Sequence, residues 1–417
     1  MPVELILFDL DDTLLRTADL EPYRGRDFLN RQSPEYIQRL SAQFRALPGR
    51  VMYSEQQLQA LQLRFPGVRL GVFTRSPRHY AETLLGLAYP NVNWATLVAY
   101  ECVTRTKPSG EGVLLAMRVA GVVQTQNVWL VGDGKSDIQA AYDAGCWCAL
   151  DQSTWPNPRR REDWYALERL PDAIIHSPDE LMDVLGRPFD YLPVAERLRE
   201  LNGQLDGERA HRFSKIGYFN PLVTAGPATQ IHSLGRHFSS DARQRVIWHP
   251  VTNDIHHMKN LMVVPDYWMG AIRSFIRNVV LNNIPLLAWG MGDLVITVVP
   301  AKPGRVQRLE AMVTQIANSH AAVPMGVENL EFNPNLLMYL PGAQSHHGNG
   351  LSRTQRFENV RDYLRATPDS GVNGKHVVVI DDVATSGASL IYSEIYLRAA
   401  GAASVTLLAL TKNVGIG

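Results

Sequence analysis

The sequence predicts an α/β protein with two domains. Three runs of apolar residues end abruptly in acidic residues, which is the pattern of buried parallel strands with a ligand at their carboxyl edge. The runs are Leu5–Phe8, Val128–Val131 and His376–Ile380. The third lies far from the first two, in a chain of 417 residues that is long enough for two or three domains.

Composition and charge are those of an ordinary globular protein. Hydrophobic residues make up 45% of the chain, and 41 Lys and Arg balance 41 Asp and Glu, so net charge gives no argument for nucleic acid or membrane as a partner. Three cysteines are too few for a disulfide framework. No apolar run reaches membrane-spanning length, and Met1–Glu4 has no basic region. We expect a soluble cytoplasmic protein.

The first strand ends in a cluster of carboxylates. Asp9, Asp11 and Asp12 follow Phe8 directly, and they would repel one another unless a cation or a metal-bound phosphate were present. A helix N-cap would explain Asp12 or Thr13 but not the pair Asp9 and Asp11. The pattern therefore favours a functional site.

The segment Asp9–Thr13 resembles the first motif, DxDxT, of the haloacid dehalogenase (HAD) superfamily. The resemblance implies that Asp9 attacks phosphorus and that Asp11 is the general acid/base. It also implies Mg²⁺ as the cofactor, held by the Asp9 side chain and the Asp11 backbone carbonyl. A carboxylate is a reasonable nucleophile for phosphorus when a cation neutralises the phosphate.

Two further stretches resemble HAD motifs. Leu70–Phe73 reads as a short buried strand followed by Thr74 and Arg75, and the resemblance assigns Thr74 to a phosphate oxygen. Arg75 is either a second phosphate contact or a solvated loop residue. Lys107, before Pro108, resembles the third motif, whose lysine neutralises the aspartate and phosphate charges.

The run Val128–Val131 leads into Gly132-Asp133-Gly134 and, one turn later, Asp137. The glycines permit a tight turn with the backbone close to a ligand. The four-residue spacing brings Asp133 and Asp137 toward one Mg²⁺. This resembles the fourth HAD motif, GDxxxD, so all four motifs occur in order within about residues 1–150.

The remaining patterns set the domain limits. Ser33–Ala46 and Ser54–Phe65 predict helices, and the short insertion that they form indicates a minimal cap. Trp155–Arg161 is a basic loop, which is either a solvated surface or an anion contact. We predict a Rossmann-like HAD domain over residues 1–187, a linker over 188–210 and a second α/β domain over 211–417.

In the second half, Asp293–Pro300 predicts a strand, followed by Lys302 and Arg305 beside a glycine. Such a loop either clamps a diphosphate or is merely solvated. Trp268–Asn282 predicts an amphipathic helix.

The strongest signal of this half follows His376–Ile380. Asp381 and Asp382 could accept hydrogen bonds from a ribose diol, and a small-residue loop before a helix over Leu390–Ala400 is suited to a phosphate monoester. A glycine-rich turn without a ligand would not explain the acid pair. The loop consists of Ala384, Thr385, Ser386, Gly387, Ala388 and Ser389.

The stretch IDDVATSGAS resembles the phosphoribosyl pyrophosphate (PRPP) motif of type I phosphoribosyltransferases, and LSRTQRFENVRDYL upstream is similar to the ComF-like branch. The resemblance implies that Asp381 and Asp382 hold the ribose hydroxyls, that the loop holds the 5-phosphate, and that Lys302 and Arg305 lie in the pyrophosphate loop. His211–Gly292 aligns with nothing, so the acceptor base is not readable.

Two functions fit these patterns. The first is a two-site enzyme: a Mg²⁺-dependent phosphohydrolase joined to a phosphoribosyltransferase, with PRPP, nucleotides or other phosphorylated small molecules as ligands. The second is a regulatory protein, of a bacterial stress-response or phage-defence kind, whose second half senses PRPP or a nucleotide without turnover. The sequence does not decide whether nucleic acid, a partner protein or a second copy binds.

Overall fold

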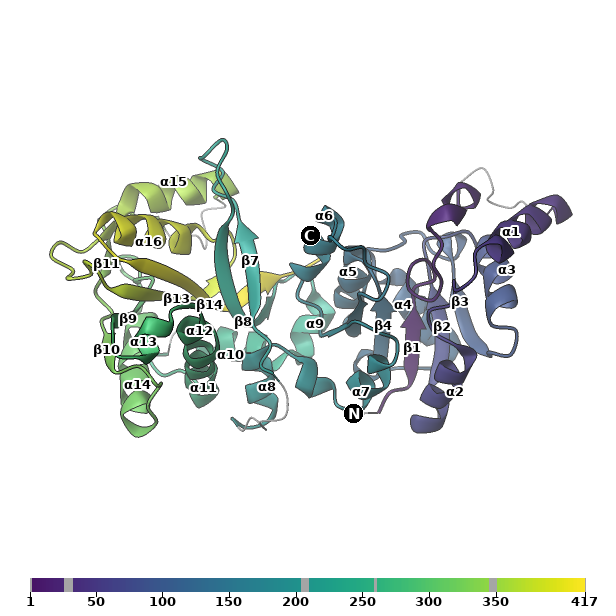
Figure 1. The fold of residues 1–417 in the computed structure, drawn as a ribbon, viewed down its shortest axis with the longest axis horizontal. Helices are drawn as coiled ribbons and strands as arrows, with labels where there is room; N and C mark the ends of the chain where they lie inside the picture. Colours follow the sequence, from purple (N-terminus) through teal and green to yellow (C-terminus); the bar gives the residue numbers. More distant parts are fainter. Residues whose placement is uncertain (1, 26–32, 204–209, 259–260, 345–350, 417) are drawn as a thin grey trace. The chain divides into compact units, whose positions relative to one another are not determined.

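The computed structural model of the protein describes residues 2–25, 33–203, 210–258, 261–344 and 351–416. The chain forms two compact units, coloured along the sequence in Figure 1. The first unit contains Met1–Leu192, Phe238–His249 and Val414–Gly417. The second contains Pro193–His237 and Pro250–Asn413.

These limits differ in detail from the domain limits read from the sequence. The segment Phe238–His249 lies within the expected second domain but belongs to the first unit. Of the expected linker 188–210, residues 193–203 pack with the second unit, and residues 204–209 lie outside the described part of the chain.

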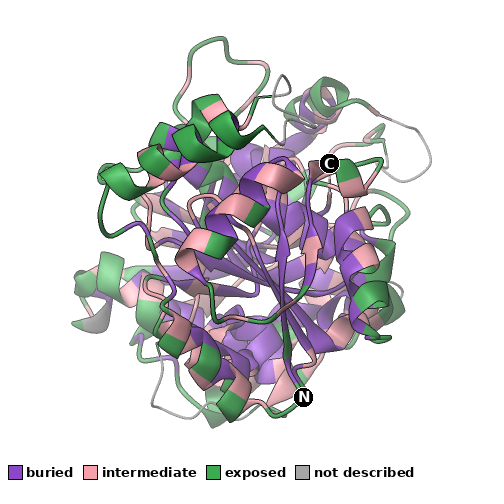
Figure 2. Ribbon diagram, turned by 90° about the vertical axis from the view of Figure 1, so that its right-hand side faces the viewer, coloured by how far each residue is buried: buried purple, intermediate pink, exposed green. Residues whose placement is uncertain are grey.

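The first unit is a parallel sheet in the order β3-β2-β1-β4-β5-β6. The chain runs outward from β1 in one direction through β2 and β3, and in the other through β4, β5 and β6. Figure 2 shows the buried strands between helices whose outer faces are exposed. The strands are β1 (Leu5–Phe8), β2 (Arg69–Phe73), β3 (Trp94–Val98), β4 (Val128–Gly132), β5 (Trp147–Asp151) and β6 (Ala173–Ile175).

Helices surround this sheet, and their ends follow local capping rules. The predicted helix over Ser33–Ala46 is confirmed as α1: Ser33 Oγ accepts a hydrogen bond from the Tyr36 amide at 3.2 Å. Ser54 and Gln57 form a capping box at the start of α2. The helices are α1 (Pro34–Ala46), α2 (Glu55–Arg64), α3 (Arg78–Ala88), α4 (Glu111–Ala120), α5 (Lys135–Ala144), α6 (Arg161–Leu167), α7 (Glu180–Gly186) and α9 (Arg243–Trp248), with 3-10 turns at Ala18–Tyr23, Tyr100–Cys102, Thr125–Asn127 and Pro188–Tyr191.

The second unit is also an α/β structure. Its six-stranded sheet has the order β10-β9-β13-β14-β8-β7, in which β10, β9, β13 and β14 pair in parallel and β7 and β8 form an antiparallel pair. A separate pair, β11 and β12, is antiparallel. The strands are β7 (Ser214–Tyr218), β8 (Thr229–Phe238), β9 (Asp293–Val298), β10 (Asn329–Phe332), β11 (Leu337–Tyr339), β12 (Leu364–Ala366), β13 (His376–Ala384) and β14 (Ser404–Val414).

Two helices of this unit, α14 and α16, pack against strands of its sheet, and others pack on neighbouring helices. The expected helix over Trp268–Asn282 is present, but a π-helical turn at Ile276–Val280 interrupts it. The helices are α8 (Val194–Glu200), α10 (Pro250–His257), α11 (Asp266–Phe275), α12 (Leu281–Asn283), α13 (Pro285–Ala288), α14 (Arg308–Ala322), α15 (Arg353–Tyr363) and α16 (Ala388–Ala399). Their core joins Trp268, Ile272 and Phe275 to strand residues such as Ile296 and Ile380.

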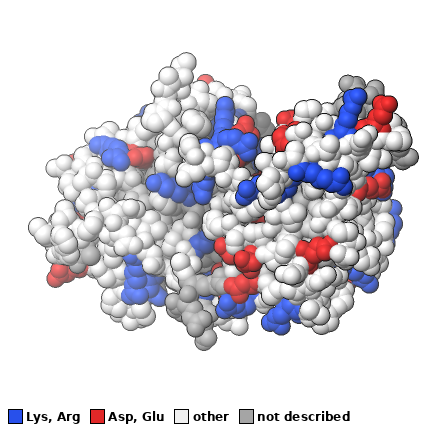
Figure 3. Space-filling model, turned by 45° about the vertical axis from the view of Figure 1, so that its right-hand side comes forward, with Lys and Arg blue, Asp and Glu red and all other residues white. Residues whose placement is uncertain are grey.

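The surface shows no segregation of charge over the face drawn in Figure 3, where Lys and Arg side chains alternate with Asp and Glu side chains. Among the described residues, no helix is both long enough and apolar enough to cross a membrane.

The inserted segment Phe238–His249 contributes a buried cation to the first unit. The Arg245 and Asp172 side chains form an ion pair and are each only 1% exposed. Arg245 also donates to the Cys146 carbonyl at 2.8 Å, and its guanidinium carbon lies 3.9 Å from the centroid of the Trp248 ring. This pair could not be predicted from the sequence, because the two residues lie far apart along the chain.

We expect Arg245→Met to lower the free energy of unfolding of the first unit by about 3–5 kcal/mol, because the Asp172 carboxylate would stay buried without its cation. Methionine keeps the apolar contacts with the surrounding rings. Chemical denaturation of the full chain, followed by tryptophan fluorescence, measures the loss.

Arg187→Met is the matched control. Arg187 pairs with Asp183 at 2.8 Å, but the two side chains are 53% and 39% exposed. An exposed pair contributes up to about 1 kcal/mol. Equal losses in the two variants would contradict the importance of the buried pair.

Candidate active site

The carboxyl ends of β1 and β4 meet at the point where the strand order of the first unit reverses. Open α/β sheets form their ligand crevices at such a point. Asp9 follows β1 and Asp133 follows β4, and the two strands pair directly. The Asp9 amide donates to the Val131 carbonyl at 2.8 Å, which fixes the first loop against the second.

Lys107 joins two of these acids. Its Nζ lies 2.8 Å from Asp9 Oδ1 and 2.5 Å from Asp137 Oδ1, and the residue is 3% exposed. Burial acts to lower the pKa of Lys107, but the attraction of Asp137 and Asp9 outweighs it, so the pKa is raised. Lys107 is therefore a fixed positive charge inside the site.

Asp9, Asp133 and Asp137 each offer a carboxylate oxygen, and these atoms lie within 4.8 Å of one another. Burial, followed by repulsion from Asp137 and Asp11, raises the pKa of Asp9 to about 7 although Lys107 acts to lower it. Burial and the same crowding raise the pKa of Asp133. Three hard oxygen donors that repel one another fit a divalent cation such as Mg²⁺.

The charges of this group balance with a divalent cation when all three acids are ionised. Three ionised carboxylates would carry three negative charges and Lys107 one positive charge, so two negative charges would remain. One divalent cation would neutralise them.

The carboxylate of Asp11 is separate from this acidic group. It accepts hydrogen bonds from Ser76 Oγ at 2.5 Å, Thr17 Oγ1 at 2.7 Å and the Tyr80 hydroxyl at 2.9 Å. Arg24 Nη1 lies 3.6 Å from it. Burial, followed by the charge of Asp11, raises the pKa of Tyr80, so that hydroxyl stays a donor.

None of these four partners of Asp11 was a sequence-predicted site residue. Ser76 follows Thr74 and Arg75 and had only the local signal of a strand end. Tyr80 lies on the first turn of α3, and its distance from Asp11 along the sequence does not indicate that the two side chains meet.

Thr74 and Arg75 have different environments. Thr74 is 1% exposed and its Oγ1 accepts a hydrogen bond from the Ser76 amide at 3.0 Å. Arg75 is exposed at the next position. The structure thus brings Thr74 to the loop that holds Asp11, whereas the Arg75 side chain has no described contact with the acids.

Gly132 is required by the close approach of Asp137. A Cβ atom at position 132 would lie 2.3 Å from Asp137 Cγ. The Gly134 amide donates to Asp137 Oδ2 at 3.1 Å, so the same loop also holds the second oxygen. Asp12, on the facing loop, has a φ of 57°, a conformation that non-glycine residues adopt rarely.

In the second unit, Asp381 and Asp382 lie within β13, which continues four residues beyond its expected end at Ile380. Asp382 forms an ion pair with Arg308, the first residue of α14. Burial raises the pKa of Asp381 to about 7, although Arg308 and Lys302 act to lower it.

The loop after β13 leads through Gly387 into α16. Gly387 has a φ of 77°, and α16 begins at the next residue. A Cβ at Gly387 would lie 2.8 Å from Tyr218 Cδ1. Ala384, Gly387 and Ala388 are buried, Ser386 and Ser389 are partly exposed, and Thr385 is exposed. The Tyr339 hydroxyl lies 3.4 Å from Ser389 Oγ.

The two predicted basic residues differ in exposure. Lys302 Nζ donates to the Gln344 carbonyl at 2.7 Å, and burial lowers the pKa of Lys302 to about 8. Arg305 is exposed in the following turn. Arg308, which pairs with Asp382, was not predicted. Its only signal in the sequence was its position three residues after Arg305, which itself lies three residues after Lys302.

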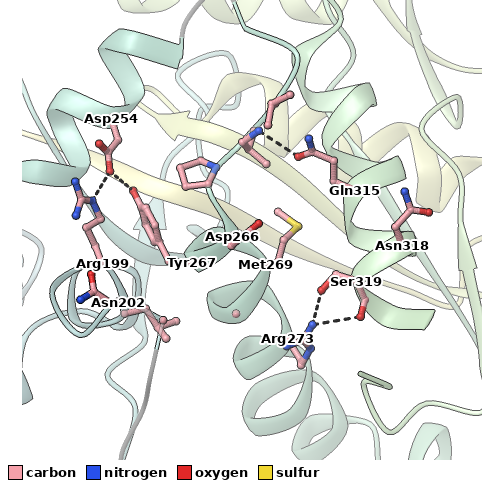
Figure 4. Close-up of a pocket in the computed structure, with 16 residues that line it drawn as sticks. Arg199, Asn202, Asp254, Asp266, Tyr267, Met269, Arg273, Gln315, Asn318 and Ser319 are labelled. Atoms are coloured by element: carbon pink, nitrogen blue, oxygen red, sulfur yellow. Dashed lines mark hydrogen bonds and ion pairs between the residues drawn. The ribbon is translucent and has the colours of Figure 1, made fainter. Parts of the chain in front are cut away.

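A cavity of about 860 Å³ lies elsewhere in the second unit, between α8, α11 and α14. In Figure 4 its polar side chains pair with one another: Asp254 accepts from Arg199 at 2.7 Å and from Tyr267 at 3.0 Å, while Arg273 donates to Ser319. No sequence-predicted site residue lines it.

Comparisons with known proteins assign the first unit to a family. The model of the haloacid dehalogenase-like hydrolase family matches residues 27–150. N-acetylmuramic acid 6-phosphate phosphatase of Pseudomonas aeruginosa is 31% identical over 175 residues, which are 42% of this chain and 70% of that protein. The chain belongs to the haloacid dehalogenase-like hydrolase family.

Two further proteins are similar to this chain over nearly their whole length. Pyrophosphatase PpaX of Halalkalibacterium halodurans is 26% identical over 217 residues, 45% of this chain and 98% of that protein. The crystal structure of CbbY from Rhodobacter sphaeroides in complex with phosphate is 21% identical, covers 43% of this chain and 96% of its own, and has a TM-score of 0.33. The chain is thus a HAD-type phosphatase that acts on phosphorylated substrates.

We expect Gly132→Ala to lower kcat for an aryl phosphate more than tenfold, because the added methyl group must displace the Asp137 carboxylate. Steady-state hydrolysis of p-nitrophenyl phosphate measures this. Gly86→Ala is the control, since no atom lies within 4 Å of the added Cβ. A Gly132→Ala protein as active as Gly86→Ala would show that the position of Asp137 does not limit turnover.

Proposed function

We propose that the first unit hydrolyses a phosphate monoester with Asp9 as the nucleophile and Asp11 as the general acid/base. The observation that supports this most is the convergence of Asp9, Asp133 and Asp137 on one point beside Lys107. A Mg²⁺ ion held by the three acids and the Asp11 backbone carbonyl would neutralise the phosphate charge.

The reaction balances with these two acids. An Asp9 oxygen forms a bond to phosphorus while the bond from phosphorus to the leaving oxygen breaks, and protonated Asp11 gives its proton to that oxygen. Water then attacks the phosphoaspartate, Asp11 takes the proton of the water, and phosphate leaves with Asp9 regenerated. The positive charge of Lys107 would stabilise the negative charge on Asp9 and on the phosphate throughout the reaction.

The hydrogen bonds of Asp11 hold its carboxylate in one rotamer. The donors are Ser76, Thr17 and Tyr80, and a fixed acid/base group is what proton transfer to and from a substrate requires. Thr74, buried beneath this loop, would contact a phosphate oxygen. The substrate would be a phosphorylated small molecule, a class to which the substrate in the name of the Pseudomonas aeruginosa relative belongs.

We expect Asp9→Asn to abolish hydrolysis of p-nitrophenyl phosphate without unfolding the protein, because an amide is neither a nucleophile nor an anionic ligand. Asp11→Asn should lower kcat at least a hundredfold, since no proton is available for the leaving group. Circular dichroism checks the fold. Removal of divalent cations by a chelator should abolish turnover, and added Mg²⁺ should restore it.

Asp183→Asn is the matched control, since the Asp183 side chain is 39% exposed and forms an ion pair with Arg187 at the end of α7. Full turnover in the Asp9→Asn protein would remove Asp9 from the role of nucleophile.

For the second unit we propose a site for a ribose 5-phosphate compound, PRPP above all. Asp381 and Asp382 would accept the ribose hydroxyls, and the loop Ala384–Ser389 would hold the 5-phosphate. The support comes from the left-handed Gly387, which directs the chain into α16 so that the first amides of this helix border the loop. Lys302 and Arg305 would contact the pyrophosphate.

The two versions of this proposal, enzyme and sensor, differ in what the basic residues must do. An enzyme stabilises the departing pyrophosphate, so its basic residues contribute more to the transition state than to binding. A sensor needs recognition alone. Of the two we favour the enzyme, because the acid pair Asp381 and Asp382 and the loop Ala384–Ser389 are both intact in the sequence.

Calorimetric titration with PRPP and Mg²⁺ tests the site. Asp381→Ala and Asp382→Ala should each weaken binding by roughly 1.5–3 kcal/mol, the contribution of a hydrogen bond to a charged group. If the unit is an enzyme, Lys302→Ala with Arg305→Ala should reduce pyrophosphate release more than it reduces affinity.

The control is Lys375→Ala, since Lys375 forms an ion pair with Glu331 at 2.7 Å on the sheet of the same unit. PRPP binding without release of pyrophosphate, tested with purine, pyrimidine and nicotinamide acceptors, would exclude the enzyme and support the sensor. An absence of PRPP binding at millimolar Mg²⁺ would refute both versions.

A further inference from the structure

A patch of exposed and partly exposed basic and aromatic side chains borders the acidic site of the first unit. We call it the basic-aromatic patch. It is formed by the loop after β5, by α6 and by the start of α5, which packs against α6. Its residues are Lys135, Trp155, Arg159, Arg161, Trp164 and Tyr165.

Two hydrogen bonds fix the loop to the catalytic loops. The Trp155 indole donates to the carbonyl of Asp133 at 3.0 Å. The hydroxyl of Thr154 donates to the carbonyl of Asp12 at 2.6 Å. The patch therefore starts next to the loops that carry the acids. A ligand that extends from the patch toward these loops can place a phosphate at Asp9.

The basic groups are stacked on the rings. The guanidinium carbon of Arg159 lies 5.5 Å from the Trp155 ring centroid and 5.8 Å from that of Trp164. Arg161 and Lys135 both lie over Tyr165, at 5.3 Å and 5.8 Å. A guanidinium over a ring face still has N–H groups that point outward in its own plane, where they can donate to a phosphate.

The aromatic residues remain accessible beyond these stacks. Trp164 is 55% exposed and Tyr165 is 38% exposed, which is unusual for large aromatic side chains. They therefore offer ring surface to a flat ligand. Exposed aromatic rings beside stacked arginines are the combination that binds the bases and phosphates of single-stranded nucleic acid.

The local charge is positive after its internal pairs are counted. Arg160 lies 4.0 Å from Asp163 and is compensated by it. Arg159, Arg161 and Lys135 remain, with the exposed Glu162 of α6 as an opposing charge, while Glu168 and Arg169, which both act on Lys135, offset each other. The patch therefore keeps an excess of about two positive charges, which phosphate groups of a ligand outside the acidic site would balance.

We propose that the basic-aromatic patch binds the nucleoside part of the substrate, so that the HAD site removes a phosphate monoester from a nucleotide or from the end of a single-stranded nucleic acid. The inference rests on the phosphohydrolase function proposed above and names its substrate class. A base stacks on Trp164 or Tyr165, and Arg159 and Arg161 bind any further phosphates.

The test compares specificity between two double variants of the full chain. Arg159→Ala with Trp164→Ala removes one basic and one aromatic group from the patch. Arg118→Ala with Leu114→Ala is the matched control, because both of these residues are exposed on α4 and Leu114 is 43% exposed. The substrates are a 5′-phosphorylated oligonucleotide, adenosine 5′-monophosphate, glucose 6-phosphate and p-nitrophenyl phosphate.

We expect the parent protein to hydrolyse at least one nucleoside substrate with a kcat/KM at least tenfold above that for glucose 6-phosphate. In the patch variant, the ratio of kcat/KM for that substrate to kcat/KM for p-nitrophenyl phosphate should fall at least tenfold. The control should keep the ratio of the parent. Arg159→Lys with Trp164→Phe should restore part of it, since a cation and a ring are both retained.

A parent protein without preference for a nucleoside substrate, or a patch variant with an unchanged ratio, would overturn the proposal. A preference for the oligonucleotide with strong salt dependence identifies a nucleic acid end as the source, and a preference for adenosine 5′-monophosphate identifies a free nucleotide. Equal or better hydrolysis of a phosphoserine peptide would also overturn it.

Binding to the inactive Asp9→Asn protein separates this inference from the phosphatase assignment. Fluorescence anisotropy of a labelled 5′-phosphorylated oligonucleotide, with competition by adenosine 5′-monophosphate, should show affinity that the patch variant lowers at least tenfold. If the parent did not hydrolyse p-nitrophenyl phosphate, the phosphohydrolase function would fail, yet the binding measurement would still support or refute the patch.

Discussion

The double ion pair of Lys107 with Asp9 and Asp137 is the interaction on which the first unit depends. Without it, the acids at the ends of β1 and β4 would face one another in a buried crevice with no internal countercharge. The lysine compensates one of three charges. The sheet edge thus stays negative enough to attract a divalent cation, while the loops that carry the acids remain held together.

The second unit handles its acids differently. Arg308 pairs with Asp382, and Lys302 lowers the energy of an ionised Asp381. The acid pair is therefore neutralised by side chains of the protein itself. In the proposed ribose site the hydroxyl groups would compete with Arg308 for Asp382, so the arrangement of α14 would influence how strongly a ribose binds.

Local patterns in the sequence predicted much of the fold and the acids that lie together at the carboxyl edge of the first sheet. The α/β class of the first unit, α1 with its Ser33 cap, and the acidic strand ends all follow from periodicity, capping and the position of Asp residues after apolar runs. The contacts of Asp11 with Tyr80 and Arg24 could not be predicted this way, because they join residues from separate elements. The same holds for the pair of Arg245 and Asp172, where a cation from the second half completes a core of the first.

That pair also shows that the first unit is discontinuous along the chain. During synthesis the first 192 residues emerge with Asp172 and the rings around it, but Arg245 and Trp248 follow only after β7 and β8. Residues 414–416 follow only after the whole second unit, and the carbonyl of Ile416 accepts a hydrogen bond from Gln139 at 2.6 Å. Whereas a contiguous domain can finish folding while the ribosome translates the next one, this phosphatase unit reaches its final packing only after the second unit has been synthesised.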